Sequence, residues 1–173
     1  MLKGPETGAN PEEEAEQEKI RRLAMASSRL KDDMPYYDLM GEAEKLVKEG
    51  ILAHIRPGGG GLSGEDEYYY VPEKGSYGLV NVVLEIRRLP DFHTGKGWKL
   101  IGHELSRYDE NGKLKTYVSK AIEGSIEKKG DYEYHKNGKI KTKRVLGPVP
   151  LENKLEEEIT NYDEQGREIA TEL

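Results

Sequence analysis

The sequence predicts an α+β protein in which an N-terminal helical pair precedes an antiparallel β-meander of about six to eight strands. Three observations indicate this fold class. Apolar residues recur at helical spacing in the first third of the chain, β-permissive stretches fill the rest, and Gly-containing turns separate those stretches. Two helices cannot cover both faces of so long a sheet, so we expect one face to be exposed and charged. An alternative form of this sheet is one that curls toward a barrel.

The first helix is predicted to begin at Pro11. Asn10 is the expected N-cap, Pro11 suits the first helical position, and the glutamates that follow suit the positive end of the helix dipole. The apolar stripe of this helix consists of Ile20, Leu23 and Leu30. Because the stripe is narrow, we interpret it as a surface for a partner rather than as a firm anchor in a core.

A second helix is predicted from about Pro35 to Glu49. Its apolar residues share one face at helical spacing: Tyr36, Leu39, Met40, Ala43, Leu46 and Val47. Gly50 supplies the left-handed residue that ends a helix, and Ile51 is expected to contact Leu46.

The chain divides by composition into a disordered tail (1–9), a helical segment (10–56), a Gly-rich loop (57–67) and an antiparallel hairpin domain (68–173). Within the hairpin domain, the stretch from Tyr77 to Leu89 has apolar residues on both faces, so we expect a central strand that is covered on both sides. The other strands are predicted by their residue types: Tyr68 to Val71, Trp98 to Tyr108, Lys113 to Ile122, Lys139 to Leu146 and Arg167 to Leu173.

One short pattern occurs three times: Tyr108-Asp-Glu-Asn-Gly112, Tyr134-His-Lys-Asn-Gly138 and Tyr162-Asp-Glu-Gln-Gly166. From Gly112 to Gly138 is 26 residues, and from Gly138 to Gly166 is 28. Each copy is flanked by β-permissive residues, as in a hairpin. Asn-Gly pairs favour a tight type I′ turn, in which both central residues have positive φ, so we expect positive φ at Gly112 and Gly138.

These hairpins resemble the Tyr-Asp-x-x-Gly repeats of YD/Rhs-type proteins and the MORN-like repeats of bacterial accessory and antitoxin proteins. The resemblance covers residues 98–173. It implies a modular sheet that wraps or contacts other proteins and does not catalyse a reaction. The period is longer than that of a MORN repeat and the additional MORN glycines are missing. Ordinary hairpin turns in an unrelated meander are the alternative explanation.

Composition narrows the possible functions. The formal net charge of −6 argues against a general nucleic-acid binder, because phosphate affinity needs a basic face. The chain has no cysteine, and therefore no disulfide framework, thiolate nucleophile or Cys-based zinc site. Its first residues lack the apolar core of a signal peptide, and no apolar run is long enough to span a membrane. We therefore expect a cytoplasmic protein.

Two motifs suggest a ligand. Leu46 to Leu52 followed by Tyr68 to Gly75 resembles the recognition helix and wing of winged-helix regulators, but Glu65, Asp66 and Glu67 at the wing tip would repel phosphate. Gly59-x-Gly61-x-x-Gly64 matches a dinucleotide fingerprint as a string, yet no helix follows it.

The four histidines suggest a metal site only if they converge. Asp91, His93 and His103 could do so through a tight 90–97 loop, although no spacing enforces it. We interpret His54, His93, His103 and His135 as surface residues, and we predict no metal, cofactor or catalytic residue.

The remaining surface features favour protein binding. Lys139, Lys141 and Lys143 alternate along one strand, either as a patch for an acidic partner or as a solvated face paired with Glu156, Glu157 and Glu158. Tyr68, Tyr69 and Tyr70 can anchor a partner or simply pack on the sheet. We predict a non-enzymatic protein-binding module, of the accessory, immunity, antitoxin-like or assembly kind. The alternatives are a winged-helix-like nucleic-acid-binding regulator and a small-molecule-binding β-barrel. The predicted partner-binding residues are Ile20, Leu23, Leu30, Tyr68, Tyr69, Tyr70, Lys139, Lys141 and Lys143.

Overall fold

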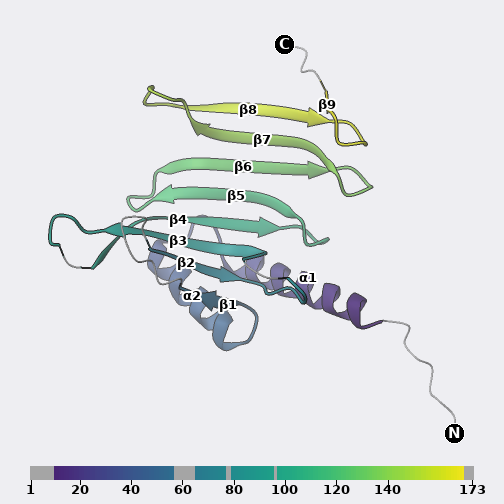
Figure 1. Cartoon of the computed structure of the whole chain (residues 1–173), viewed down its shortest axis with the longest axis horizontal. Coiled ribbons are helices and arrows are strands. Elements are labelled where there is room, and N and C mark those ends of the chain that lie inside the picture. The colour runs from purple at the N-terminus through teal and green to yellow at the C-terminus, as the bar shows by residue number, and fades with distance from the viewer. Residues whose placement is uncertain (1–9, 57–64, 77–78, 96, 170–173) are drawn as a thin grey trace, which may run out of the picture.

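The computed structural model describes residues 10–56, 65–76, 79–95 and 97–169. Two helices lead into a nine-stranded antiparallel sheet whose strands follow one another in chain order (Figure 1). The α+β prediction is confirmed, with nine strands instead of six to eight. The sheet is open, with β1 and β9 at its two edges, so the barrel alternative is wrong. The elements are α1 Pro11–Arg29, α2 Tyr36–Lys48, β1 Ala53–Ile55, β2 Glu65–Tyr70, β3 Val82–Pro90, β4 Trp98–Tyr108, β5 Leu114–Ala121, β6 Ile126–Tyr134, β7 Ile140–Pro148, β8 Leu155–Tyr162 and β9 Glu168–Ile169.

The start of α1 and the end of α2 are capped as the sequence predicts. The Asn10 side chain accepts a hydrogen bond of 2.8 Å from the Glu13 N–H, which caps α1. Gly50 has φ +75°, and the Ile51 N–H donates to the Leu46 carbonyl at 2.9 Å, which closes α2. Arg29 joins the two helices through Glu42, at 2.6 Å, and through Glu49.

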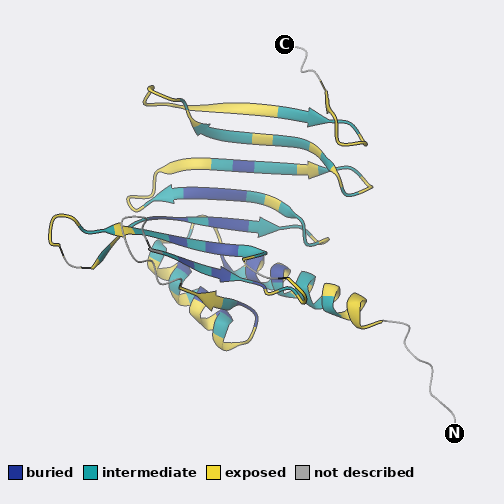
Figure 2. Ribbon diagram, viewed as in Figure 1, coloured by how far each residue is buried: buried dark blue, intermediate teal, exposed yellow. Residues whose placement is uncertain are grey.

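The core lies between the helices and one face of the first strands, which we call the helix-covered face. Tyr69, Leu84, Leu105 and Val118 are direct neighbours across β2 to β5 and mark this face. Burial is concentrated here (Figure 2). The helices contribute six fully buried residues to this core: Leu23, Ala26, Leu30, Leu39, Ala43 and Leu46.

Two hydrogen bonds fix α1 on β4. The Tyr108 N–H donates to the Ser27 hydroxyl at 3.2 Å, and Arg107 donates to the Ser27 carbonyl at 3.0 Å. The Tyr108 hydroxyl in turn donates to the Val82 carbonyl on β3, at 2.8 Å. This tyrosine, from the first copy of the repeated pattern, therefore connects the helical layer to two strands.

Several predicted boundaries differ from the structure. Residues 65–67, placed in the Gly-rich loop, form the start of β2, and β1 from the helical segment pairs with β2. The central strand begins at Val82, not Tyr77, and only one of its faces is covered: Leu84 and Ile86 face the helices, whereas Glu85 and Arg87 lie on the other face. The single helical layer explains this difference. The predicted tail 1–9, the loop residues 57–64 and the last four residues of the predicted C-terminal strand lie outside the described residues.

The helices in the described ranges are α1 and α2. Neither of them is both long enough and apolar enough to cross a membrane.

The burial of Leu23 leads to a stability prediction. Leu23→Ala should lower the free energy of unfolding by about 2–5 kcal/mol, because it removes apolar contacts and leaves a cavity in the core. Ile169→Ala is the matched control, since Ile169 is 48% exposed, and it should change stability by no more than about 0.5 kcal/mol. Chemical denaturation measures both. Equal small effects would place Leu23 outside the core.

Candidate protein-binding surface

The three repeated patterns form three equivalent turns at one end of the sheet. In each turn the residue that follows the tyrosine donates its backbone N–H to the carbonyl oxygen of the residue four positions later, at 2.8 Å. The glycine N–H donates to the carbonyl oxygen of that same residue after the tyrosine, at 2.9–3.0 Å. The glycines have positive φ, +76°, +88° and +86°, which confirms the prediction for Gly112 and Gly138. The turn type was predicted wrongly. Asn111 and Asn137 do not have positive φ, so these are three-residue loops that end in a left-handed glycine.

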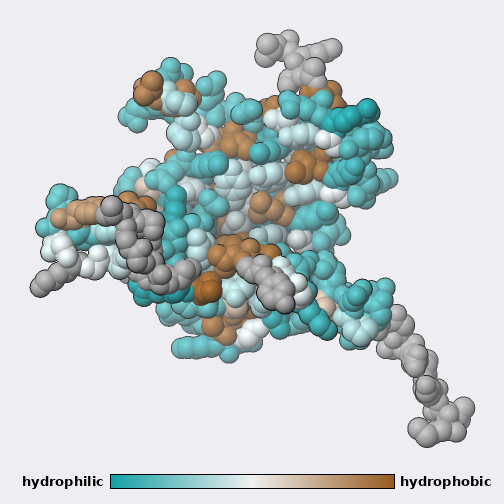
Figure 3. All heavy atoms as spheres, viewed as in Figure 1, coloured by the Kyte–Doolittle hydropathy of each residue, from teal (hydrophilic) through white to brown (hydrophobic). Residues whose placement is uncertain are grey.

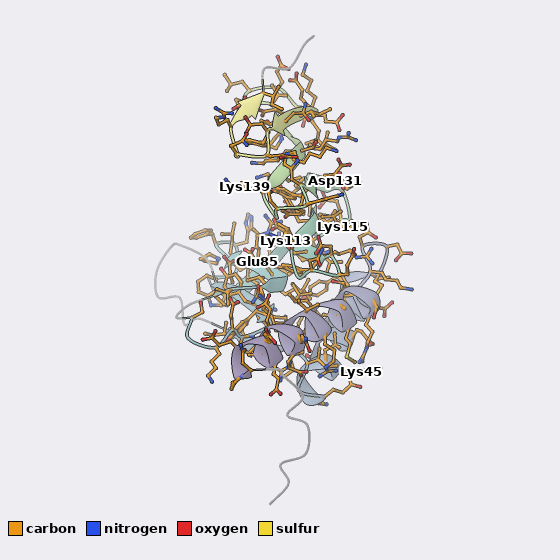
Figure 4. The ribbon with its side chains drawn as sticks, turned by 90° about the vertical axis from the view of Figure 1, so that its right-hand side faces the viewer. Lys45, Glu85, Lys113, Lys115, Asp131 and Lys139 are labelled. Atoms are coloured by element: carbon orange, nitrogen blue, oxygen red, sulfur yellow. The ribbon has the colours of Figure 1, made fainter. Side chains whose placement is uncertain are left out.

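Neighbouring turns are connected by side chains, and we call the set 109–113, 135–139 and 163–167 the turn ladder. The Lys113 Nζ donates to the Gly138 carbonyl at 2.8 Å, and the Lys139 Nζ donates to the Gln165 carbonyl at 2.9 Å. Asn137 adds a bond to the Glu164 carbonyl at 2.7 Å. Figure 4 looks at this end of the sheet and shows Lys113 and Lys139 at successive levels above the helices.

Helix α1 packs against the first turn of the ladder. Ile20 lies so close to Gly112 that a Cβ atom there would meet its Cγ1 at 3.0 Å. The ladder therefore begins at the helical layer and extends away from it, which gives the strands beyond β5 a fixed position relative to the core.

Strands β6–β9 lie beyond the helical layer, and we call residues 126–169 the bare sheet. Gly130 is the only residue of this range that is buried. Figure 4 shows the sheet continuing above the helices with side chains on both sides. Four large apolar residues of the bare sheet are 38–48% exposed: Ile126, Leu155, Ile159 and Ile169. In Figure 3 apolar side chains form separate patches among hydrophilic ones. This part of the sheet therefore offers apolar contacts that this chain does not use.

The face opposite the helices, which we call the open face, carries charge over β2 to β6. Tyr68, Glu85, Glu104, Ser119 and Lys128 are direct neighbours in one row across the strands. Burial, together with Glu104 and Asp66, raises the pKa of Glu85. The predicted charge is therefore present on this face, but the predicted exposure is not general. Glu85 and Glu104 are half-buried and Ser119 is 2% exposed, whereas Lys128 is exposed.

Arg87 bridges several strands on the open face. It donates to the Ser119 hydroxyl at 2.7 Å and to Glu127 at 3.0 Å. A shallow groove runs from Arg87 and Glu104 to the β7–β8 loop, where Glu152 and Lys154 complete its lining. The lining contains both signs of charge, so the groove favours neither a simple anion nor a simple cation.

A tyrosine pair connects the open face to the bare sheet. The rings of Tyr117 and Tyr132 have centroids 6.3 Å apart, and the Lys128 ammonium lies 5.8 Å from the Tyr117 ring. A Cβ atom at Gly130 would meet the Tyr117 ring at 2.2 Å, so the glycine makes room for this ring. An aromatic ring thus covers the glycine in β6 and helps to hold the bare sheet to β5.

A second cluster, inside the fold, joins β1, β2 and β3. Glu67 is 6% exposed, accepts a hydrogen bond of 2.6 Å from Arg88, and pairs with His54. The His54 ring stacks on Tyr69 at 4.5 Å. Burial opposes ionisation of Glu67, but hydrogen bonds from Arg88 and His54 outweigh it and lower its pKa. These contacts satisfy a buried carboxylate and connect three strands.

Several predicted site residues are not on the surface. Leu23 and Leu30 are fully buried and Tyr69 is 1% exposed, so the interpretation of these three as partner contacts is wrong. The stripe is narrow, but its residues insert into the core because Ala26 and Ser27 let α1 approach the sheet. Ile20, Tyr68 and Tyr70 are half-buried.

The basic strand also differs from its prediction. Lys139 and Lys141 are exposed and Lys143 is half-buried. A bulge at Lys141 shifts the register of the strand. As a result Lys143 shares its face with Ile140 and not with Lys139. The glutamates 156–158 lie opposite residues 145–147, so the predicted pairing with the three lysines does not form.

The histidines do not converge. His54 pairs with Glu67, His103 is buried, His93 lies in an exposed loop, and His135 contacts the Tyr162 carbonyl at 2.8 Å. Burial lowers the pKa of His103, and the nearby charges of Lys120 and Arg87 lower it further. In the ranges that the structure describes, no three His, Asp or Glu side chains are grouped to hold a metal ion.

The roles of Lys113, Tyr132 and Gly130 were missed by sequence reasoning. A signal for Lys113 was present, because Gly112-Lys-Leu-Lys-Thr116 recurs almost unchanged as Gly138-Lys-Ile-Lys-Thr142. The fit of Tyr117 over Gly130 depends on strand register and has no local signal.

Comparison with known proteins gives no assignment. No protein-family model matches the chain, and no curated protein matches it. A solved structure of a Bacteroides fragilis NCTC 9343 protein of unknown function is similar at 11% identity and a TM-score of 0.32, with 64% of this chain and 92% of that chain covered.

The turn ladder can be tested at Gly138. Gly138→Val should lower the free energy of unfolding by about 1 kcal/mol or more, because a β-branched residue is strained at positive φ. Gly147→Val is the control, since Gly147 lies in β7 without positive φ, and a Cβ atom added there would have no other atom within 4 Å. An equal response of the two variants in thermal unfolding would contradict the ladder.

The Glu67 cluster predicts a pH effect. Because the pKa of Glu67 is lower in the folded protein, its contribution to stability is present above its unfolded pKa, about 4.3, and is lost as the pH falls through the folded value. The stability difference between wild type and Glu67→Gln should therefore shrink on acidification. Urea unfolding across this pH range measures it, and a difference independent of pH would show that Glu67 is not held as an ion.

Proposed function

We propose that the protein is a non-enzymatic protein-binding module whose partner packs on the bare sheet. The observation that supports this proposal best is the exposure of residues 126–169, of which Gly130 alone is buried although every strand is paired. A β-sheet normally buries at least one face against a second layer. Here the second layer would come from the partner.

The chemistry of the bare sheet suits a protein rather than a small ligand. Isolated exposed isoleucines among charged side chains resemble the apolar contacts and polar surroundings of a protein interface. Tyr132 lies on the open face as the direct neighbour of Lys143, and tyrosine is one of the side chains that most often dominate interface energies. The turn ladder positions these side chains before binding, which reduces the entropy lost on association.

The proposal predicts that two exposed apolar residues of the bare sheet are needed for binding. Ile126→Glu with Ile169→Glu should remove a specific partner from affinity capture in the native lysate, because carboxylates would be buried at the interface. The control is Leu79→Glu with Leu89→Glu, which changes the same charge at similar exposure: 41% and 44%, against 41% and 48%.

Quantitative mass spectrometry of the captured proteins gives the readout. A protein retained by the wild type and the control but lost from the bare-sheet variant supports the proposal. Identical captured sets from all three proteins, each with an unchanged circular-dichroism spectrum, would contradict it.

A further inference from the structure

We infer that the outer edge of β8, residues Leu155 to Thr160, binds a basic, extended segment of the partner as an added strand. This inference rests on the proposed function and names the chemistry of the partner. We call these six residues the β8 edge.

Backbone geometry shows which groups of the β8 edge point outward. At one end of β8 the Val149 N–H donates to the Lys154 carbonyl at 3.1 Å, so these two residues form a hydrogen-bonded pair. In an antiparallel ladder every second residue of a strand bonds to the same neighbour, so residues 156, 158 and 160 direct their N–H and C=O groups toward β7. At the other end the Asp163 N–H donates to the Arg167 carbonyl at 2.8 Å, so residues 161, 159 and 157 point toward β9. The two ends agree. The N–H and C=O groups of Glu157 and Ile159 therefore lie in the plane of the sheet and point away from β7, beyond its edge.

The described part of β9 covers little of this side. It pairs with Asn161 and Tyr162 only. Within the residues that the structure describes, no strand lies against the side of Leu155 to Thr160 that faces away from β7. An open edge of this kind is a template for strand addition, in which main-chain hydrogen bonds supply affinity and alternate side chains supply specificity.

Charge identifies the occupant. Glu156, Glu157 and Glu158 are all exposed, and their direct neighbours on β7 are Gly147, Leu146 and Val145, which carry no charge. No described ion pair includes any of the three glutamates. Because side chains alternate, Glu157 lies on one face and Glu156 and Glu158 on the other. A strand with lysine or arginine on both faces would complement all three carboxylates.

The same charge disfavours other occupants. In a second copy of this chain, the edge would place glutamates opposite glutamates, and like charges directly opposite each other destabilise a strand pair. A nucleic-acid backbone would be repelled as well. A basic polypeptide segment is the occupant that the edge complements both in backbone and in charge.

The probe is a labelled ten-residue peptide in which pairs of lysines alternate with pairs of valines, so that an extended strand carries lysine on both faces. Fluorescence anisotropy measures its binding to the full chain. Ile159→Pro removes an outward N–H, and the fold should tolerate it because that N–H takes no part in the β7–β8 ladder. Because the added strand loses a main-chain donor, binding should weaken by about tenfold or more. Ile159→Ala shortens the same side chain but keeps the N–H, so it should weaken binding clearly less than Ile159→Pro does.

Charge has its own matched pair of variants. Glu156, Glu157 and Glu158 changed together to Gln should weaken binding by about tenfold. The same change at Glu12, Glu13 and Glu14, an exposed acidic triplet on α1, should have little effect. Equal losses from the two triplets would mean general attraction of a cation to an acidic protein, and would overturn the inference.

A change in the probe guards against misfolded variants. Wild-type protein should lose affinity for the peptide when two adjacent central amides are N-methylated, since both edges of the peptide then lack a donor. Undiminished binding would overturn strand addition. Two other results would also overturn the inference. Dimers in native mass spectrometry that Ile159→Pro abolishes would assign the edge to a second copy. Peptide binding that appears only after deletion of residues 170–173 would assign the edge to the chain itself. Failure of the peptide while the bare-sheet capture succeeds would leave the proposed function standing and place the partner on a sheet face.

Discussion

Two helices provide the second layer in the described part of this protein, and α1 contacts the sheet chiefly at β3 and β4 (Figure 1). That short layer determines where a core can form. Residues from α1, α2 and β2–β4 make up most of the buried cluster, with Ile51, Leu52 and Val71 from the connections between elements. Beyond β5 the described residues supply no second layer to bury side chains against. The composition changes accordingly, with glutamates and lysines at positions that alternate between the two faces. The contrast between a packed half and an exposed half follows from this one limit on coverage.

The exposed half must therefore be held by other interactions. Its strands are joined by the main-chain ladder, by lysine and asparagine side chains that reach the backbone of the next turn, and by the Tyr117 ring over Gly130. Each contact of this kind contributes little, on the order of 1 kcal/mol for a hydrogen bond. They act in series from the first turn, which α1 supports through Ile20. A sheet built in this way keeps its shape without removing its side chains from solvent, which is the property that a preformed binding surface needs.

Local signals in the sequence were sufficient for much of the fold. The Asn10 cap, the left-handed Gly50 and the positive φ of the turn glycines depend on neighbours within a few residues, and each was predictable. The fate of Leu23 and Leu30 was not, because a narrow stripe is buried or exposed according to how closely the helix approaches the sheet, and Ala26 and Ser27 set that approach only in three dimensions. The type I′ prediction failed because Asn-Gly is compatible with more than one loop length. The bulge at Lys141 then moved the lysines off a common face, and a shift of one residue in register cannot be read from alternation alone. The exposure of β8 likewise follows from where the helices end, not from any property of residues 155–162.

The central claim is that the bare sheet is folded on its own chain without a covering layer, and native-state hydrogen exchange followed by NMR tests it most directly. The account predicts that the amides of β6 and β7 exchange much more slowly than in an unfolded chain, yet faster than those of β3 and β4, because the helix-covered core opens only in global unfolding. Exchange at the unfolded rate throughout residues 126–148, while β3 and β4 remain protected, would contradict the account, since the surface proposed for binding would not exist before the partner arrives.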